Sequence, residues 1–234
     1  MKKLKMTMRI PVTLGLFAAL LGSAEAAAAK ESDRPNIIFV LCDDLGPGDL
    51  GALWQNGRKG KQKFTTPNMD QFAKEGMILS RHYCPAPSCM ASRSSLMTGR
   101  HQGHCARRNT QFDAEIPDVH TLGSVMSKAG YATAAIGKWG MAGGPHQLSI
   151  KPVRGDRSPK TNPSHPTLRG FDYFYGYTAH RDAHYHYPKL GNRPLYDGFV
   201  DVTDRLAKCY STDLLTARAK KWIADHHKAN PKKP

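Results

Sequence analysis

A cysteine in a short stretch rich in serine and arginine is the first residue of this sequence that could do chemistry. Residues 86–100 read APSCMASRSSLMTGR, with Cys89 ahead of Arg93 and a Gly-Arg pair that ends the stretch. Such a cysteine could be half of a disulfide, a nucleophile, or the precursor of another group. The chain has five cysteines, an odd number, so in an oxidising compartment one is left over or is not a thiol in the mature protein.

Two carboxylates and a lysine stand where predicted strands end. Asp43 and Asp44 directly follow the apolar run 36–42, and Lys138 lies near the end of the run 131–140. Ligands collect at the carboxyl ends of strands in open α/β sheets, and adjacent carboxylates favour a hard cation such as Ca²⁺ or Mg²⁺. Lys138 could stabilise an anionic substrate or leaving group. The alternatives are solvated acids in a strand-ending turn and an exposed lysine beside a packed Trp139.

Three histidines gather in the stretch HRDAHYHY at 180–187. His180, His184 and His186 could bind a metal, serve as acids, or contact substrate. Their spacing fits no zinc pattern, and the stretch is predicted to be a loop. A surface loop without a chemical role is the alternative.

The elements that must position these residues alternate along the chain. A strand is predicted at 36–42, then a helix that begins at Pro67 and ends at Gly76, with Pro at its first turn. Further strands are predicted at 77–83 and 131–140, and further helices at 92–97, 119–130 and 212–229, while residues 170–177 are aromatic and punctuated by glycines. The alternation predicts an α/β fold, a mostly parallel sheet flanked by helices.

The first 26 residues have the composition of a secretory signal peptide. Four basic residues precede an apolar run from about Ile10 to Leu21, and an Ala-x-Ala site at 24–26 follows. The apolar run is too short to span a bilayer comfortably, so no stable membrane anchor is expected. The sequence therefore predicts a periplasmic or secreted protein.

The chain is strongly basic. Its formal net charge is +15, and about +12 after removal of the leader, which carries four basic residues and one acidic residue. A basic exported protein could meet sulfated glycans, anionic surfaces or nucleic acid, or could simply have a solvated basic surface. Charge by itself names no substrate.

The motifs together resemble the type I sulfatases. That family has the pattern C-x-P/A-S-R followed by x-x-L-x-T-G-R, which matches residues 89–93 and 94–100. Further matches occur in the family's order and cover roughly residues 34 to 188: Asp43–Gly46, Gly48–Gly51, Thr66–Asp70, Gly137–Trp139, and 170–176. The resemblance implies an alkaline-phosphatase/sulfatase-like fold.

The resemblance also implies a specific chemistry. The family's cysteine is oxidised by a maturation enzyme to formylglycine, whose hydrated aldehyde attacks sulfur; here that residue is Cys89. Arg93 matches the arginine that orients this group, and Lys138 matches the lysine beside the sulfate. Asp43, Asp44 and residue 89 match ligands of Ca²⁺, with Mg²⁺ as a second possibility. The implied substrate is a sulfated small molecule or glycan, with His184 as a contact, and no nucleic acid partner is expected.

Two departures and one absence qualify the match. Ala91 stands where proline is commoner, and Gly140 where many members have histidine. The family's Asp-Asn-Gly segment, with further metal ligands, has no counterpart here. We therefore expect residues 34–234 to be the N-terminal part of a sulfatase catalytic domain, with an incomplete sheet and little activity by itself. The alternatives are an inactive polyanion-binding fragment and a phosphonate or phosphate monoester hydrolase of the same superfamily.

Overall fold

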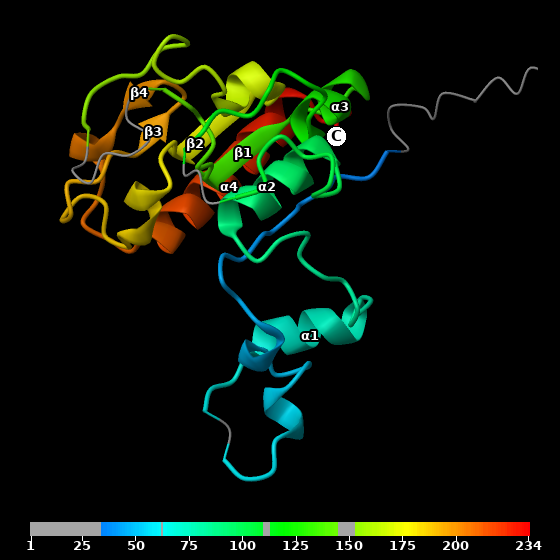
Figure 1. Cartoon of the computed structure of the whole chain (residues 1–234). Helices are drawn as coiled ribbons and strands as arrows, with labels where there is room; N and C mark the ends of the chain where they lie inside the picture. The colour runs from blue at the N-terminus through cyan, green and yellow to red at the C-terminus, as the bar shows by residue number, and fades with distance from the viewer. Residues whose placement is uncertain (1–33, 62, 110–112, 145–152) are drawn as a thin grey trace, which may run out of the picture.

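A small mixed sheet forms the centre of the molecule. The computed structural model describes residues 34–61, 63–109, 113–144 and 153–234, so the predicted leader lies outside the described residues. The strands lie in the order β1 (Ala134–Lys138), β2 (Tyr173–Tyr177), β3 (Tyr196–Asp197) and β4 (Val200–Asp201) (Figure 1). The β1–β2 pair is parallel and the other two pairs are antiparallel. The predicted α/β fold with helices around a sheet is confirmed, although the described sheet is mixed.

Two glycines allow the parallel pair to form. Gly137 of β1 and Gly176 of β2 are direct partners in the register. A Cβ atom on Gly176 would lie 2.0 Å from the carbonyl oxygen of Gly137, well inside contact distance. A side chain at this position would therefore push apart the strand that ends at Lys138 and its neighbour.

The helices begin and end where their capping residues predict. Helix α3 (Leu122–Lys128) starts with a capping box, in which Thr121 Oγ1 accepts from the Ser124 backbone N–H at 3.2 Å. Helix α2 (Cys89–Thr98) ends at Gly99, which has the left-handed conformation with φ of 62°. Helices α1 (Pro67–Glu75) and α4 (Ser211–Ala229) confirm the other two predicted helices.

The core lies on both faces of the sheet because successive side chains of β2 point in opposite directions. Phe174 packs in one cluster with Met90 of α2 and Trp139. Tyr175 and Tyr177 belong to the second cluster, against which Leu215 of α4 packs. The sheet therefore lies between α2 and α4. Helix α2 packs against β2 and against β1, the strand that ends at Lys138.

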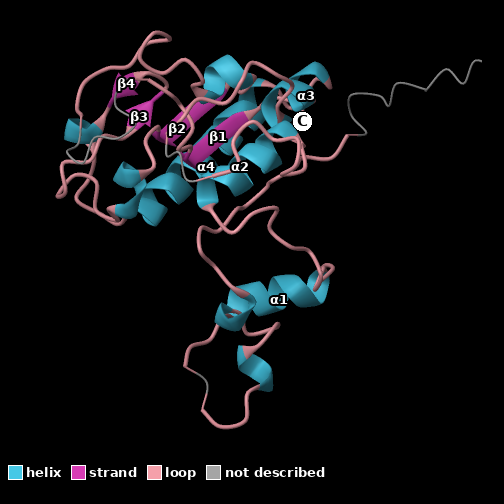
Figure 2. Cartoon of the chain, in the orientation of Figure 1, coloured by secondary structure: helices cyan, strands magenta, loops and turns pink. Residues whose placement is uncertain are grey.

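Two predicted strands are wrong. Residues 36–42 and 77–83 contain no strand, and they are drawn as loop in Figure 2. Val40 is 77% exposed and Met77 83% exposed. A strand needs a neighbour for its backbone N–H and C=O groups, and within the described residues neither segment has one. Both segments belong to residues 34–88, here called the N-terminal arm, whose helix α1 projects away from the sheet (Figure 1).

Candidate functional site

The first turn of helix α2 carries the reactive cysteine and its arginine. Cys89 is the first residue of the helix, and Arg93 lies one turn later on the same side. Arg93 donates from its guanidinium to the backbone carbonyl of Lys138 at 2.7 Å. This contact joins the start of α2 to the end of β1, so Cys89, Arg93 and Lys138 are brought together as the sequence predicted.

Asp43 links the N-terminal arm to these cations. Its Oδ2 lies 2.6 Å from Lys138 Nζ and 3.6 Å from the guanidinium of Arg93. Burial opposes ionisation of Asp43, but the hydrogen bond and charge of Lys138, with help from Arg93, outweigh it and lower the pKa of Asp43. The carboxylate is therefore ionised at neutral pH and faces two cations.

Two histidines complete this cluster. His180 Nδ1 lies 3.5 Å from Cys89 Sγ, and His180 Nε2 lies 3.1 Å from His184 Nε2. Burial, followed by the positive charge of Lys138, lowers the pKa of His180 to about 4 and also lowers the pKa of His184. Both rings are thus neutral at pH 7, so one Nε2–H donates to the other ring's Nε2.

His184 was the predicted substrate contact, whereas the histidine that touches Cys89 is His180. Both belong to one 3-10 turn, η5 (Arg181–His184), with His180 as its N-cap residue. His186 leaves the cluster, because its ring packs against the ring of Tyr210 at 5.4 Å between centroids. The histidine-rich stretch pointed to this region, but its spacing could not tell which ring lies at the cysteine.

Asp113 is a site residue that the sequence did not indicate. It is 6% exposed, and its Oδ1 accepts a hydrogen bond from the backbone N–H of His180. Burial raises the pKa of Asp113 to about 6. An aspartate in a polar loop carries no local signal of this role, since its contact with His180 spans 67 positions of sequence.

Asp44 lies beside the cluster in an unusual backbone conformation. Its φ of 58° is in the left-handed region, which aspartate tolerates better than most residues. The charges of Asp43 and Asp44 both act on His184, and both favour its protonated form. Both carboxylates are therefore close enough to His184 to act on its charge, while only Asp43 is shown in contact with Lys138.

The described residues do not form a complete calcium site. Ca²⁺ takes about six to eight oxygen ligands, and within the described residues no group of three or more His, Cys, Asp and Glu side chains is arranged to hold a metal. Asp43 is already engaged by Lys138 and Arg93.

The five cysteines, all within the described residues, are free thiols. By their number, the four cysteines other than Cys89 could have formed two disulfides, but the structure joins none of them.

Among the helices of the described residues, none is long and apolar enough to cross a bilayer.

Comparison with known proteins shows the family to which the chain belongs. The sequence model of the sulfatase family matches residues 35–234, and the chain therefore belongs to the sulfatase family. It is 37% identical to arylsulfatase D of Homo sapiens over 177 residues, which are 71% of this chain and 27% of that protein. It is 34% identical to arylsulfatase G of Rattus norvegicus over 191 residues, 76% of this chain and 31% of that protein. The chain thus spans less than a third of the length of these relatives.

Solved structures show the same fold. The crystal structure of Ps i-CgsB matches with a TM-score of 0.57 and 28% identity, over 82% of this chain and 41% of that one. The same protein in complex with the oligosaccharide k-i-k-neocarrahexaose matches with a TM-score of 0.56 and 27% identity. The alkaline-phosphatase/sulfatase-like fold expected from the sequence is confirmed.

Proposed function

We propose that this chain carries the nucleophile and the anion-binding side chains of a sulfate ester hydrolase. The observation that supports this most directly is that α2, β1 and η5 meet at residue 89. Arg93 of α2 bonds to the carbonyl of Lys138 at the end of β1, and His180, which contacts His184, contacts Cys89. Family membership supports sulfate esters as the substrate class. The oligosaccharide bound by Ps i-CgsB favours a sulfated glycan over a small aryl sulfate.

In this proposal Cys89 is the precursor of formylglycine, which supplies a nucleophilic hydroxyl when hydrated. The chain's own residues hold and neutralise the anionic group. Lys138 and Arg93 place two positive charges beside residue 89, where a sulfate needs them, and both are largely shielded from water, with side chains 9% and 13% exposed. Charges in such a place stabilise the anion more than exposed charges do.

The histidines have a different role in the proposal. His184 contacts the substrate, while His180 lies between it and residue 89. Because both rings are neutral, each can donate one N–H and accept one hydrogen bond. One of the two N–H groups is used between the rings, so the ring that accepts there has its Nδ1–H to donate to an ester oxygen, and this adds no charge beside Lys138 and Arg93.

Mass spectrometry of the peptide that contains Cys89 tests the precursor role. The full chain is co-expressed with a formylglycine-generating enzyme, and formylglycine is expected at position 89 alone. Cys84, an exposed thiol in the arm, is the internal control and should stay a thiol. An unmodified Cys89 after complete maturation of a known substrate protein would reject this role.

Binding and turnover of an aryl sulfate and of a sulfated oligosaccharide test the activity. Binding is measured beside turnover because the chain spans only part of its relatives' length. Lys138→Ala should weaken binding and Cys89→Ala should abolish any turnover, whereas Cys84→Ala should change neither. Tighter binding of the matching phosphate ester would favour the phosphate hydrolase alternative, and glycan binding without turnover the binding fragment.

A calcium titration tests the proposed metal ligands Asp43, Asp44 and residue 89. Because two carboxylates supply too few oxygens, the chain by itself is expected to bind Ca²⁺ only weakly. Asp44→Asn should weaken that binding further. Tight binding that Asp44→Asn leaves unchanged would place the metal elsewhere.

A further inference from the structure

The turn that carries both site histidines is anchored by a buried carboxylate. Asp182 lies in the middle of η5 and is 6% exposed. Its Oδ1 lies 3.4 Å from the guanidinium of Arg193, which is itself 8% exposed. Burial raises the pKa of Asp182, and the hydrogen bond and charge of Arg193 oppose that rise. The carboxylate therefore depends on Arg193 as its charge partner in a place that water hardly reaches.

The same guanidinium also holds the end of the turn. Its carbon atom lies 3.5 Å from the centroid of the Tyr185 ring, and Tyr185 directly follows His184. A planar guanidinium can stack on a ring and bond to a carboxylate at once, which a lysine ammonium cannot do. Arg193 thus fixes the residues on both sides of the Ala183–His184 pair.

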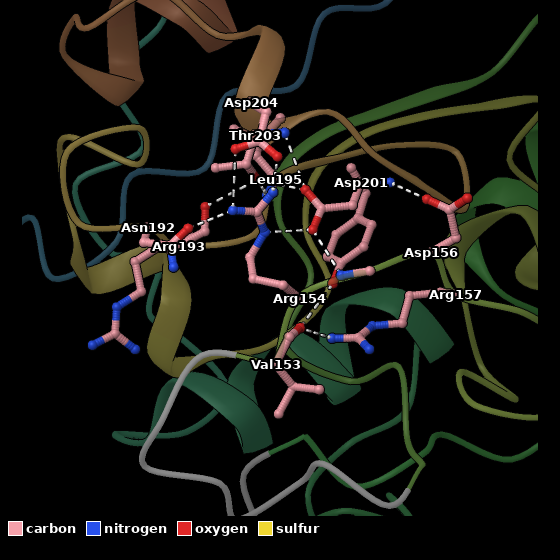
Figure 3. Close-up of polar contacts among 12 residues, drawn as sticks. Val153, Arg154, Asp156, Arg157, Asn192, Arg193, Leu195, Asp201, Thr203 and Asp204 are labelled. Atoms are coloured by element: carbon pink, nitrogen blue, oxygen red, sulfur yellow. Dashed lines mark hydrogen bonds and ion pairs between the residues drawn. The ribbon is translucent and has the colours of Figure 1, made fainter.

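Arg193 is fixed in turn from the opposite side. Its carbonyl accepts from Thr203 Oγ1 at 3.4 Å, and its neighbour Asn192 accepts from Arg154. Arg154 also pairs with Asp201 at 2.6 Å and with Asp204 at 3.0 Å. Figure 3 shows these contacts around Arg154, with the side chain of Arg193 extending away from them. The backbone that presents Arg193 is therefore held while its guanidinium reaches η5.

We propose that Arg193 and Asp182 are positioning residues that set the place of the His180 and His184 rings beside residue 89. The proposal rests on the proposed function, because it takes His184 as a contact for the sulfate group. Neither residue touches the reacting atoms. Their effect on substrate passes through the turn, whose two rings must stay 3.1 Å apart at Nε2 and within reach of Cys89.

A second arginine of the chain provides a matched control. Arg218 of α4 pairs with Asp197 at 2.9 Å and lies 4.3 Å from the centroid of the Tyr175 ring. It has the same two kinds of partner as Arg193, but they are not in η5. Arg218→Lys therefore removes the same stacking on a ring, together with a guanidinium–carboxylate contact, without acting on the histidine turn.

The test compares Arg193→Lys, Asp182→Asn and Arg218→Lys in the full chain. Nitrogen chemical shifts of the His180 and His184 imidazoles report the contact between the rings, and calorimetry with inorganic sulfate reports binding. Arg193→Lys and Asp182→Asn are expected to change the ring shifts and to weaken sulfate binding by about tenfold or more, because a misplacement of about 1 Å in a site can cost up to about a hundredfold. Arg218→Lys should change neither measurement.

The outcomes separate this proposal from the proposed function. Wild-type chain that binds no sulfate would count against the proposed function, while the ring shifts would still decide the positioning. Folded Arg193→Lys and Asp182→Asn variants with wild-type ring shifts and affinity would overturn the positioning role. Equal effects of all three variants would mean that Arg193 and Asp182 only stabilise the fold, as Arg218 does, and do not position the two rings. If Arg193→Lys does not fold, Asp182→Asn decides alone, since asparagine keeps the acceptor oxygen and the shape.

Discussion

The N-terminal arm, residues 34–88, and the sheet body, residues 89–234, contribute to the same site but are built differently. Within the described residues, every buried hydrophobic side chain belongs to the body, from Met90 to Val202. Helix α1 of the arm buries no residue. The side chain of Arg34, which donates to the carbonyl of Ala129, and the ion pairs of Asp43 attach the arm to the body. Cys89, Arg93 and Lys138 thus lie on a packed frame, whereas Asp43 and Asp44 do not.

This difference bears on how the site can work. Side chains on a packed frame are held in place before a ligand arrives, which is what stabilisation of an anion requires. Asp43 instead depends on the two cations it contacts. Under the proposed function, a sulfate that approaches Lys138 and Arg93 meets cations that already have a carboxylate partner. In that case Asp43 of the arm would exchange contacts during binding, while the side chains of the body would keep their places.

Matched isoleucine truncations test this comparison with the largest expected effect. Ile116 in the body is 0% exposed, and Ile38 in the arm is 73% exposed. Ile116→Ala should lower the free energy of unfolding by about 2–5 kcal/mol, because it removes apolar contacts and leaves a cavity. Ile38→Ala should change it by less than about 0.5 kcal/mol. Urea denaturation followed by circular dichroism measures both, and a large loss in Ile38→Ala would show that the arm is packed in solution.

The pH dependence of the body gives the next effect in size. The pKa of Asp113 is about 6 in the folded chain against 3.8 for an unperturbed aspartate. The folded state therefore binds the proton more tightly, and this residue's contribution to stability is lost as the pH rises from about 4 to 6. Asp113→Asn keeps the acceptor for the His180 N–H without a charge, so it should raise stability at pH 7 by up to about 3 kcal/mol. The gain should vanish below pH 4.

His180 makes an opposite contribution that this variant would reveal. Its pKa is about 4 in the folded chain, below the ordinary 6.5, so its contribution is lost as the pH falls through that window. Denaturation of Asp113→Asn between pH 4 and 7 should therefore show stability that rises with pH more steeply than in wild type. An Asp113→Asn chain that is less stable than wild type at pH 7 would contradict the assignment of a buried, destabilising carboxylate.

The same two regions explain where the sequence predicted the structure and where it failed. Helices α1, α3 and α4 follow from local signals such as Pro67 and the Thr121 cap, which need no distant partner. The runs at 36–42 and 77–83 have the composition of strands, but a strand also needs a neighbour, and neighbours are set by long-range pairing. Composition therefore predicted β1 correctly and those two runs wrongly, and it did not indicate β2, which pairs with β1 from 39 positions away.

The site shows the same limit. Cys89, Arg93, Lys138 and Asp43 were predicted from motifs and meet in the structure. The contacts of His180 with Cys89 and with Asp113 span 91 and 67 positions, and no motif records them. The sequence did not indicate the contacts that hold the turn η5 in place, in which buried Asp113 and Asp182 bond to a backbone N–H and to Arg193.

Asp43→Asn has the smallest expected effect, and it tests the ion pairs between the arm and the body. The carboxylate is 39% exposed, so its pairs with Lys138 and Arg93 should contribute at most about 1 kcal/mol at low salt. Its pKa is lowered, so the contribution to stability exists at a pH above the ordinary value of 3.8 and is lost as the pH falls below it.

Asp197→Asn is the matched control, because it breaks an ion pair of the body, with Arg218, whose side chains are 31% and 33% exposed. Asp43→Asn should lower the free energy of unfolding no more than Asp197→Asn does. In 0.5 M salt, where the screening length is roughly 4 Å, both effects should disappear. A larger loss from Asp43→Asn would contradict this expectation and would mean that these ion pairs supply much of the free energy that attaches the arm to the body.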